Sequence, residues 1–302
     1  MRAVSPIKRN IAVVVFIMAM AFAAELFGQH EIIFPEAGAL CVGLWLMPKA
    51  VWNVRVWQVP VYLTAAALIG LAVNMFVPAC FEIRFTLAFI AIFVLLRLVR
   101  CNMYPLVSAS MLPVLIDTTS WVYPVSVLVL SLLIAVGRKW LPQVERNEYQ
   151  PYSALKILLL VVALCVPLAV VYCAKFSPMN YLVVPPLVVT MIEFANRRSG
   201  FRERPRTIWG QIVVAAVIGV AAEYLLHRGL GLPMSVGMLI VVAVMLMSFR
   251  WFKPFAPTMA IVIVPTLLPD SALLWFPLAA AMGGGWFILY GMLLGRLQTR
   301  GV

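Results

Sequence analysis

Hydrophobic residues form long runs along the chain, and short polar stretches separate these runs. The alternation divides the sequence into twelve hydrophobic segments, at residues 10–28, 32–48, 58–78, 83–100, 104–117, 120–137, 154–174, 180–196, 208–226, 231–249, 254–268 and 272–295. The longest runs reach about 20 residues, which is the length that an α-helix needs to cross a bilayer. The pattern therefore predicts an all-α polytopic membrane protein.

Composition agrees with this prediction, and the placement of charge gives it an orientation. The chain is 64% hydrophobic and only 11% charged, with a mean hydropathy of +1.03, far from the composition of a soluble globular domain. Its net charge is +12. If the N-terminus is cytoplasmic and all twelve segments cross, the cytoplasmic side holds every basic residue except Arg84, Lys175 and Arg228. This positive-inside pattern predicts a multi-pass protein of the inner (plasma) membrane with cytoplasmic N- and C-termini, and it argues against nucleic acid as a partner.

The N-terminal segment and the cysteines add two smaller expectations. A basic start, an apolar run and the small residues of AFAAE resemble a secretory signal. The equivalent segment of the second half, 154–174, is internal, so we expect an uncleaved first span. Five cysteines stand singly without CxxC spacing, so neither a disulfide framework nor a zinc site is indicated. We expect no metal and no cofactor.

The chain contains two related halves. Pro113, Asp117 and Pro124 are spaced by four and seven residues, and Pro265, Asp270 and Pro277 by five and seven. Further matches keep an offset of about 150 residues. They are IGLA at 69–72 with IGVA at 218–221, Trp57 with Trp209, Pro35 with Pro185, Arg100 with Arg250, and Pro105 with Pro254. Each half holds six segments, an even number, so we expect two parallel repeats, at 1–138 and 154–302, joined by a cytoplasmic linker at 139–153.

Four short segments begin at proline and predict half-helices that start within the membrane. The prolines are Pro35, Pro105, Pro185 and Pro254. Proline suits the first turn of a helix, and a helix start presents N–H groups and partial positive charge to whatever it faces. We therefore expect a small-anion site between the repeats, with nearby hydroxyls as further donors. These hydroxyls belong to Ser108, Ser110 and Thr258.

The same features have a structural interpretation that the sequence leaves open. Prolines also kink membrane helices or start them late, near the membrane surface. A hydroxyl within a helix can bond its own backbone.

Several of these segments resemble a known family. FPEAGALCVGLWL, PRTIWGQ at 205–211 and SWVYPVSVLVLSLLIAV resemble motifs of the HPP family of integral membrane proteins, here apparently duplicated, over residues 30–137 and 180–295. Members of that family have been linked to nitrite transport, so the resemblance implies passage of a small inorganic anion. The histidine of the name-giving His-Pro-Pro motif is replaced in both copies, which read Met103-Tyr104-Pro105 and Phe252-Lys253-Pro254. Lys253 either adds positive charge beside a helix start or only sets topology.

Carboxylates in apolar segments are candidates for proton coupling. Asp117 and Asp270 precede the last segment of each half, where each is expected to cap a helix N-terminus or, alternatively, to be protonated at the outer mouth. Glu36 is either a first-turn acid or a gate on the pathway. Glu223, matched by Asn74 in the first half, is either a helix–helix hydrogen-bonding group or a proton-coupling group.

Glu193 has a simpler interpretation. It stands four residues before Arg197, and this spacing on a helix predicts a surface ion pair.

These observations favour a membrane transporter or channel for a small solute, with a small inorganic anion such as nitrite preferred. The alternatives are a proton- or cation-coupled transporter of a small organic solute and a membrane scaffold without transport. No Walker loop, HExxH motif or nucleophile elbow is present, and His30 and His227 are unmatched by the repeat, so we do not expect an enzyme. The expected partners are the solute and the lipid bilayer, and a homo-oligomer is compatible with the sequence.

Overall fold

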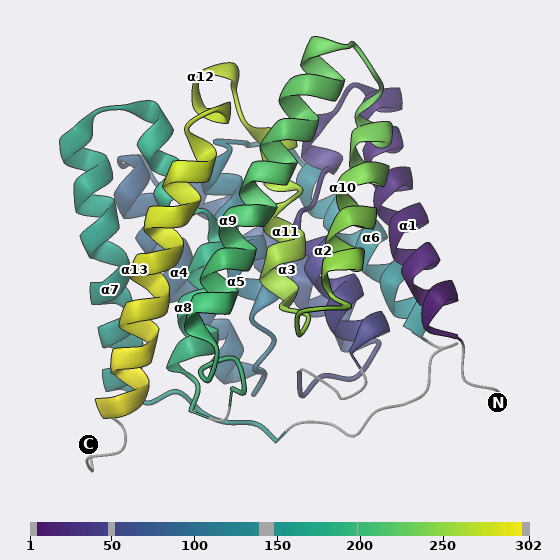
Figure 1. Cartoon of the computed structure of the whole chain (residues 1–302). Helices are drawn as coiled ribbons and strands as arrows, with labels where there is room; N and C mark the ends of the chain where they lie inside the picture. Colours follow the sequence, from purple (N-terminus) through teal and green to yellow (C-terminus); the bar gives the residue numbers. More distant parts are fainter. Residues whose placement is uncertain (1–4, 48–51, 139–147, 198, 298–302) are drawn as a thin grey trace.

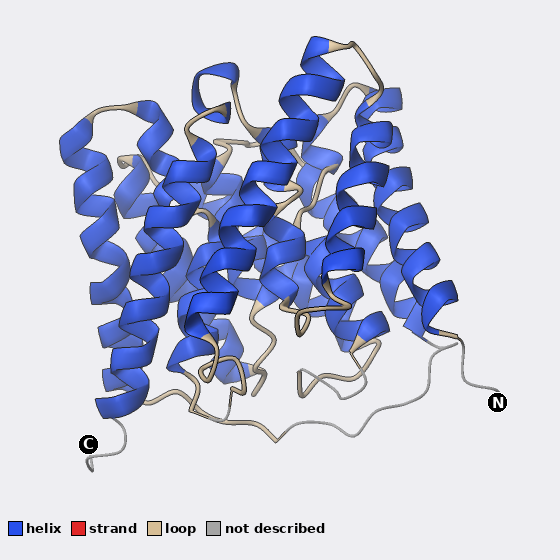
Figure 2. Ribbon diagram, in the orientation of Figure 1, coloured by secondary structure: helices blue, strands red, loops and turns tan. Residues whose placement is uncertain are grey.

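The computed structural model describes residues 5–47, 52–138, 148–197 and 199–297, and all regular structure in these residues is helical (Figure 2). Six of the described helical stretches are long and apolar enough to cross a membrane. They are Pro6–Phe27, Gln58–Phe76, Ala154–Ala174, Pro178–Ala195, Pro205–Gly229 and Phe276–Arg296. The predicted all-α fold is therefore confirmed for the described residues, and its six long apolar helices are consistent with a membrane protein. The number of crossings stays a prediction.

The helices of the first half follow the predicted segments, with the second segment shortened. They are α1 (Pro6–Phe27), the 3₁₀ turn η1 (His30–Ile32), α2 (Glu36–Cys41) with its π-helical continuation η2 (Val42–Leu46), α3 (Gln58–Phe76), α4 (Phe81–Leu98), α5 (Pro105–Leu115) and α6 (Val122–Arg138).

The helices of the second half come in a comparable order, with more interruptions. Its elements are α7 (Ala154–Ala174), the 3₁₀ helix η3 (Ser177–Val183), α8 (Pro185–Ala195), α9 (Pro205–Ala221) with its π-helical continuation η4 (Ala222–Gly229), α10 (Met234–Ser248), α11 (Ala256–Ile261), η5 (Val264–Leu267), α12 (Asp270–Leu273) and α13 (Phe276–Leu297). The expected last segment at 272–295 is thus divided between α12 and α13.

The predicted helix start at Pro254 is wrong. Phe255 is extended, and α11 begins at Ala256 with Pro257 in its first turn. A helix starting at Pro254 would place Pro257 in the fourth position, where a backbone N–H must donate the first helical hydrogen bond and proline has none.

The short helices α2, α5, α8 and α11 lie in the middle of the bundle, with longer helices around them (Figure 1). All residues of α2, α5 and α11 are buried, as are all but one of α8. The contacts between the halves are reciprocal: α1 packs against α10 and α7 against α4, while α2 packs against α11 and α8 against α5. We call the end at which α1 begins and α13 ends the lower end, and the opposite end the upper end.

Glycines at matching positions bring helices into close contact. A Cβ on Gly70 of α3 would overlap the carbonyl oxygen of Ser110 in α5, and one on Gly219 of α9 would lie 2.5 Å from the carbonyl oxygen of Val262 after α11. These are the glycines of the matched IGLA and IGVA stretches. The two stretches therefore have the same packing role in each half.

Candidate functional site

Residues of the four short helices α2, α5, α8 and α11 line one central cavity. Its lining comprises Glu36 and Ala39 of α2, Pro105 and Ser108 of α5, Pro186, Val189 and Glu193 of α8, Ala256, Pro257 and Ala260 of α11, and Trp52. Its volume is about 20 Å³. A space of this size holds about one water molecule.

Glu36 is the most unusual residue of this cavity. It opens α2 and is 1% exposed. The hydroxyl of Ser108 donates to Oε1, whereas Oε2 has no hydrogen-bond partner within the described structure. Leaving a buried polar oxygen unpaired is costly, and such groups in folded proteins are rare. The unpaired oxygen therefore points to a missing ligand, water or proton-transfer partner.

Trp52 lines the same cavity and carries a hydrogen-bond donor. Its side chain is 4% exposed, and its indole Nε1 has no acceptor among the described residues. The ring lies against Gly43 of η2, so closely that a Cβ there would overlap it. Two residues of the cavity lining thus each carry a buried polar atom without a partner among the described residues, one a donor and the other a carboxyl oxygen.

The backbone donors expected at the half-helix starts are mostly occupied. In α5, the N–H groups of Leu106 and Val107 donate to Met103 and Tyr104, two residues just before the helix. In α8, the N–H of Leu187 donates to Val184 at 2.8 Å. The prolines at the first positions have no N–H at all. Fewer donors remain for an anion than the sequence predicts.

The four predicted prolines differ in their position relative to the cavity. Pro105 lines the cavity, Pro35 precedes the first residue of α2, and Pro185 begins α8 with its neighbour Pro186 on the cavity wall. Pro254 lies before α11, and Pro257 takes the place expected for it.

The three predicted hydroxyls also differ, because only one of them lies on the cavity wall. Ser108 bonds Glu36 on the cavity wall. Ser110 donates to the Ala88 carbonyl of α4 at 3.2 Å, and Thr258 donates to the carbonyl of Phe255 at 2.6 Å. The last two hydroxyls therefore have structural partners rather than a place on the cavity wall.

A network of hydrogen bonds and an ion pair around one arginine lies at the upper end of the first half. Arg84 of α4 forms an ion pair with Asp117 at 2.9 Å and also donates to the side-chain oxygen of Asn74. The Asn74 amide donates in turn to Asp117 at 3.3 Å and to the carbonyl of Thr118 at 2.9 Å. The network ties together the ends of α3, α4 and α5.

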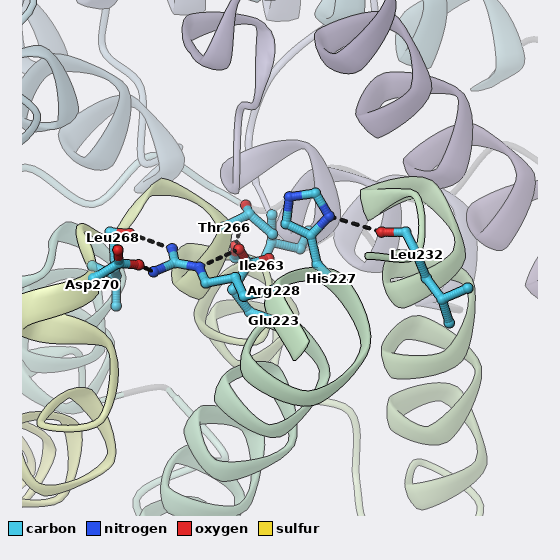
Figure 3. A network of polar contacts seen from close by, with 8 residues as sticks. All are labelled: Glu223, His227, Arg228, Leu232, Ile263, Thr266, Leu268 and Asp270. Atoms are coloured by element: carbon cyan, nitrogen blue, oxygen red, sulfur yellow. Dashed lines mark hydrogen bonds and ion pairs between the residues drawn. The ribbon is translucent and has the colours of Figure 1, made fainter. Parts of the chain in front are cut away.

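A second network has the corresponding place in the other half (Figure 3). Arg228 of η4 pairs with Glu223 at 2.9 Å and with Asp270, and it donates to the carbonyl of Leu268 at 2.7 Å. Arg84 and Arg228, two of the three basic residues that the predicted topology places outside the cytoplasm, are therefore used in these networks. We call the set around Arg84 the first network and the set around Arg228 the second.

The expected capping role of Asp117 is wrong. Asp117 follows α5 with a φ of 50°, and its carboxylate faces Arg84. The hydroxyl of Ser120 instead accepts the N–H of Val122, the first residue of α6, and the hydroxyl of Thr118 accepts the N–H of Ser120. Arg84 offers the carboxylate a full positive charge, whereas a helix start offers only a partial one.

Asp270 stands in the first turn of α12, where an acid is favourable, but its carboxylate also pairs with arginine. Together with Glu31, Thr118 and His227 it lines a polar hollow of about 840 Å³ at the upper end, to which both halves contribute.

Glu193 and Trp52 are the site residues that sequence reasoning missed. Glu193 lies on the cavity wall, and no Glu193–Arg197 ion pair is present in the described part of the chain. A signal was available, because Pro186, Val189 and Glu193 are spaced by three and four residues and so share one helix face. Trp52 follows a polar break in the pattern and carried no such signal.

Comparison with protein-family models, with curated proteins and with solved structures found no match to this chain. The resemblance to the HPP family stays a prediction.

Proposed function

We propose that the chain is a proton-coupled transporter of a small organic solute, with the central cavity as its binding position. The observation that carries the proposal is Glu36, a buried carboxyl group with one unpaired oxygen on the wall of a cavity that all four short helices line. Ionisable groups at membrane depth are costly and commonly belong to transport or proton pathways.

The geometry supplies a reason for proton coupling. Among the described residues, an ionised carboxylate in the closed cavity would have the Ser108 hydroxyl as its one side-chain partner, and burying such a charge is expensive. Glu36 is therefore protonated while the cavity is closed and loses its proton when water enters from one side. Solute and proton can then move together.

Alternating access requires two bodies that move around the site. The reciprocal contacts of α1 with α10 and of α7 with α4 support two parallel repeats, and the cavity lies between them. In this proposal the lower end is cytoplasmic, as the distribution of basic residues favours, and the membrane is the inner (plasma) membrane.

A second candidate function is passage of a small inorganic anion such as nitrite. The unpaired indole N–H of Trp52 favours it, as do the positive ends of the helix dipoles around the cavity and the resemblance to the HPP family. The occupied first-turn N–H groups and the two cavity carboxyl groups weigh against it.

The two candidates separate in a flux assay on the purified full chain in liposomes. The probes are methylammonium, glycine, nitrite, nitrate, formate and chloride, each with and without a pH gradient. Uptake of an organic probe that needs the gradient and is lost in Glu36→Gln supports the proposal. Selective anion flux that persists in Glu36→Gln favours the second candidate. No flux of any probe by folded protein would indicate a scaffold.

A further inference from the structure

A group of uncharged polar contacts lies at the lower end, next to the central cavity along the chain. We call it the lower cluster, and it consists of the side chains of Asn53, Asn102, Tyr104, Tyr152 and Asn196 with the backbone of Gln150. Three members stand within three residues of a residue of the cavity lining. These pairs are Asn53 with Trp52, Tyr104 with Pro105, and Asn196 with Glu193. The lower cluster therefore adjoins the cavity on its lower side (Figure 1).

Asn102 is the centre of the first part of this cluster. Its side-chain amide donates to the carbonyl of Gln150 at 2.9 Å, and its side-chain oxygen accepts the N–H of Gln150 at 2.8 Å. The backbone N–H of Asn102 donates to the side-chain oxygen of Asn53 at 2.7 Å. The Asn53 amide donates in turn to the carbonyl of Arg100 at 2.9 Å. These bonds join the loop after η2, the stretch before α5 and the segment before α7.

Two buried tyrosines form the second part of the cluster. The Tyr152 hydroxyl donates to the oxygen of Tyr104 at 2.6 Å, and the Asn196 side-chain amide donates to the same oxygen at 3.4 Å. The Tyr152 ring also packs edge-on against Phe93 of α4, with 5.6 Å between the ring centres. Tyr104 belongs to the first half and Asn196 to the second. This part of the cluster therefore bonds the two halves to each other.

The upper end is arranged differently. The first network joins α3, α4 and the end of α5, and the second joins η4 to the stretch around α12, so each lies within one half. The hollow of about 840 Å³ lies between the halves. Beside it, Glu25 of α1 accepts the N–H groups of Met234 and Ser235 at the start of α10. The halves thus leave an open hollow at the upper end, whereas the lower cluster joins them next to the cavity.

We propose that the lower cluster is a gate that closes the central cavity toward the lower face, and that its bonds break when access passes from the upper end to the lower end. The inference rests on the proposed alternating access, and it names the contacts that this motion breaks. Neutral hydrogen bonds suit a gate, because each is replaced by a bond to water at little net cost. The ion pairs of the upper networks stay intact, since each lies within one half.

The test measures from which face a reagent reaches the cavity, so it needs no transported solute. Ala39 of α2 lines the cavity and is 6% exposed. Ala39→Cys is the reporter, in a full chain whose five native cysteines are replaced by alanine. The probe is a membrane-impermeant methanethiosulfonate, added in turn to right-side-out and inside-out vesicles.

Two exposed positions show which face the reagent reaches in each preparation. Glu203 lies in the loop before α9 at the lower end, and Leu230 follows η4 at the upper end with 70% of its surface exposed. Glu203→Cys and Leu230→Cys, each made in the same cysteine-free chain, therefore identify the lower and the upper face.

Two variants open the gate in this assay. Asn102→Ala removes both side-chain bonds to Gln150, and Tyr152→Phe removes the hydroxyl bond to Tyr104. We expect each to raise labelling of the reporter from the lower face about tenfold, the effect of losing one or two neutral hydrogen bonds, and not to raise labelling from the upper face. Tyr62→Phe is the matched control, because its hydroxyl accepts a hydrogen bond from Gln58 in α3, outside the lower cluster. It leaves labelling from both faces unchanged.

Two results would overturn the gate. Labelling from the lower face that is no faster in Asn102→Ala and Tyr152→Phe than in Tyr62→Phe would show that the lower cluster does not control access. An equal rise from both faces would show a loosened fold.

Failure of the proposed function gives a different result. If the gate variants are labelled faster from the lower face but the wild-type protein carries none of the flux probes, the gate remains and transport is wrong. Transport by the wild-type protein, with labelling unchanged in both gate variants, removes the gate and leaves the transporter.

Discussion

The buried carboxyl group of Glu223 is paired with arginine in the second upper-end network, whereas the buried carboxyl group of Glu36 in the central cavity is not. In the second network the side chain of Glu223 is 4% exposed, and Arg228 pairs with it and with Asp270. In the cavity Glu36 is as deeply buried, yet one of its oxygens has no partner. Paired groups fix the ends of helices. The unpaired group is the one on which the proposed proton coupling rests.

The two networks also differ from each other in the number of anions around the arginine. Asn74 in the first network corresponds to Glu223 in the second, so the first has one anion for its arginine and the second has two. The arginines come from different elements, α4 and η4, and the charge around them differs as well. The two arginines should therefore have unequal effects on stability.

The largest expected effect follows from removing Arg228. Arg228→Gln leaves the carboxylate of Glu223 buried without a cation, which should cost about 3 kcal/mol of unfolding free energy. Arg84→Gln leaves a neutral amide and an aspartate whose side chain is 71% exposed, which should cost at most about 1 kcal/mol. Thermal unfolding of both variants in detergent micelles measures the difference.

A rescue variant makes this comparison sharper. Glu223→Asn copies the first network into the second half, so adding it to Arg228→Gln should restore most of the lost stability. Equal losses for the two arginine variants, or no rescue, would mean that the charge on Glu223 is not what Arg228 compensates.

The next largest effect concerns the unpaired group. Glu36→Gln should lower proton-driven flux about a hundredfold, equivalent to about 2.7 kcal/mol in the barrier. Unfolding should be unchanged, because the amide oxygen still accepts the Ser108 hydroxyl. Flux and unfolding measured on the same preparation test both halves of this statement. A variant that transports normally would make Glu36 a structural acid.

Local features of the fold were predictable from the sequence. Pro35, Pro105 and Pro185 mark helix starts because proline has a local preference for the first turn. Pro254 misled the prediction because Pro257 stands three residues later, and only one of the two can begin the helix. The glycines at 70 and 219 were recognised as a match, although not as contact points.

Long-range pairing was not predictable. Asp117 was assigned to a cap because its local position allows one, whereas its arginine comes from 33 residues earlier. Glu193 was assigned to Arg197 by the same local rule, whereas the packing of α8 against α5 turns it toward the cavity. One sequence does not show which helix faces meet.

A smaller effect is expected from the packing glycines. In Gly219→Ala the new Cβ meets the Val262 carbonyl at 2.5 Å, and overpacking of this kind costs about 1–3 kcal/mol. Gly210→Ala is the control in the same helix, because nothing lies within 4 Å of its new Cβ. Unfolding of the two variants should differ clearly. Equal stability would mean that α9 can move away from the stretch after α11 at little cost.

The smallest effect is expected at the two aspartates. Their side chains are 71% and 92% exposed, so Asp117→Asn and Asp270→Asn should each change the unfolding free energy by at most about 1 kcal/mol. The pH profile of flux should be the same as in the wild-type protein, because water already reaches both carboxylates and each has an arginine. A profile displaced in either variant would assign proton coupling to the upper mouth. Glu36 would then no longer be needed as the coupling group, and the contrast between paired and unpaired carboxylates would lose its functional meaning.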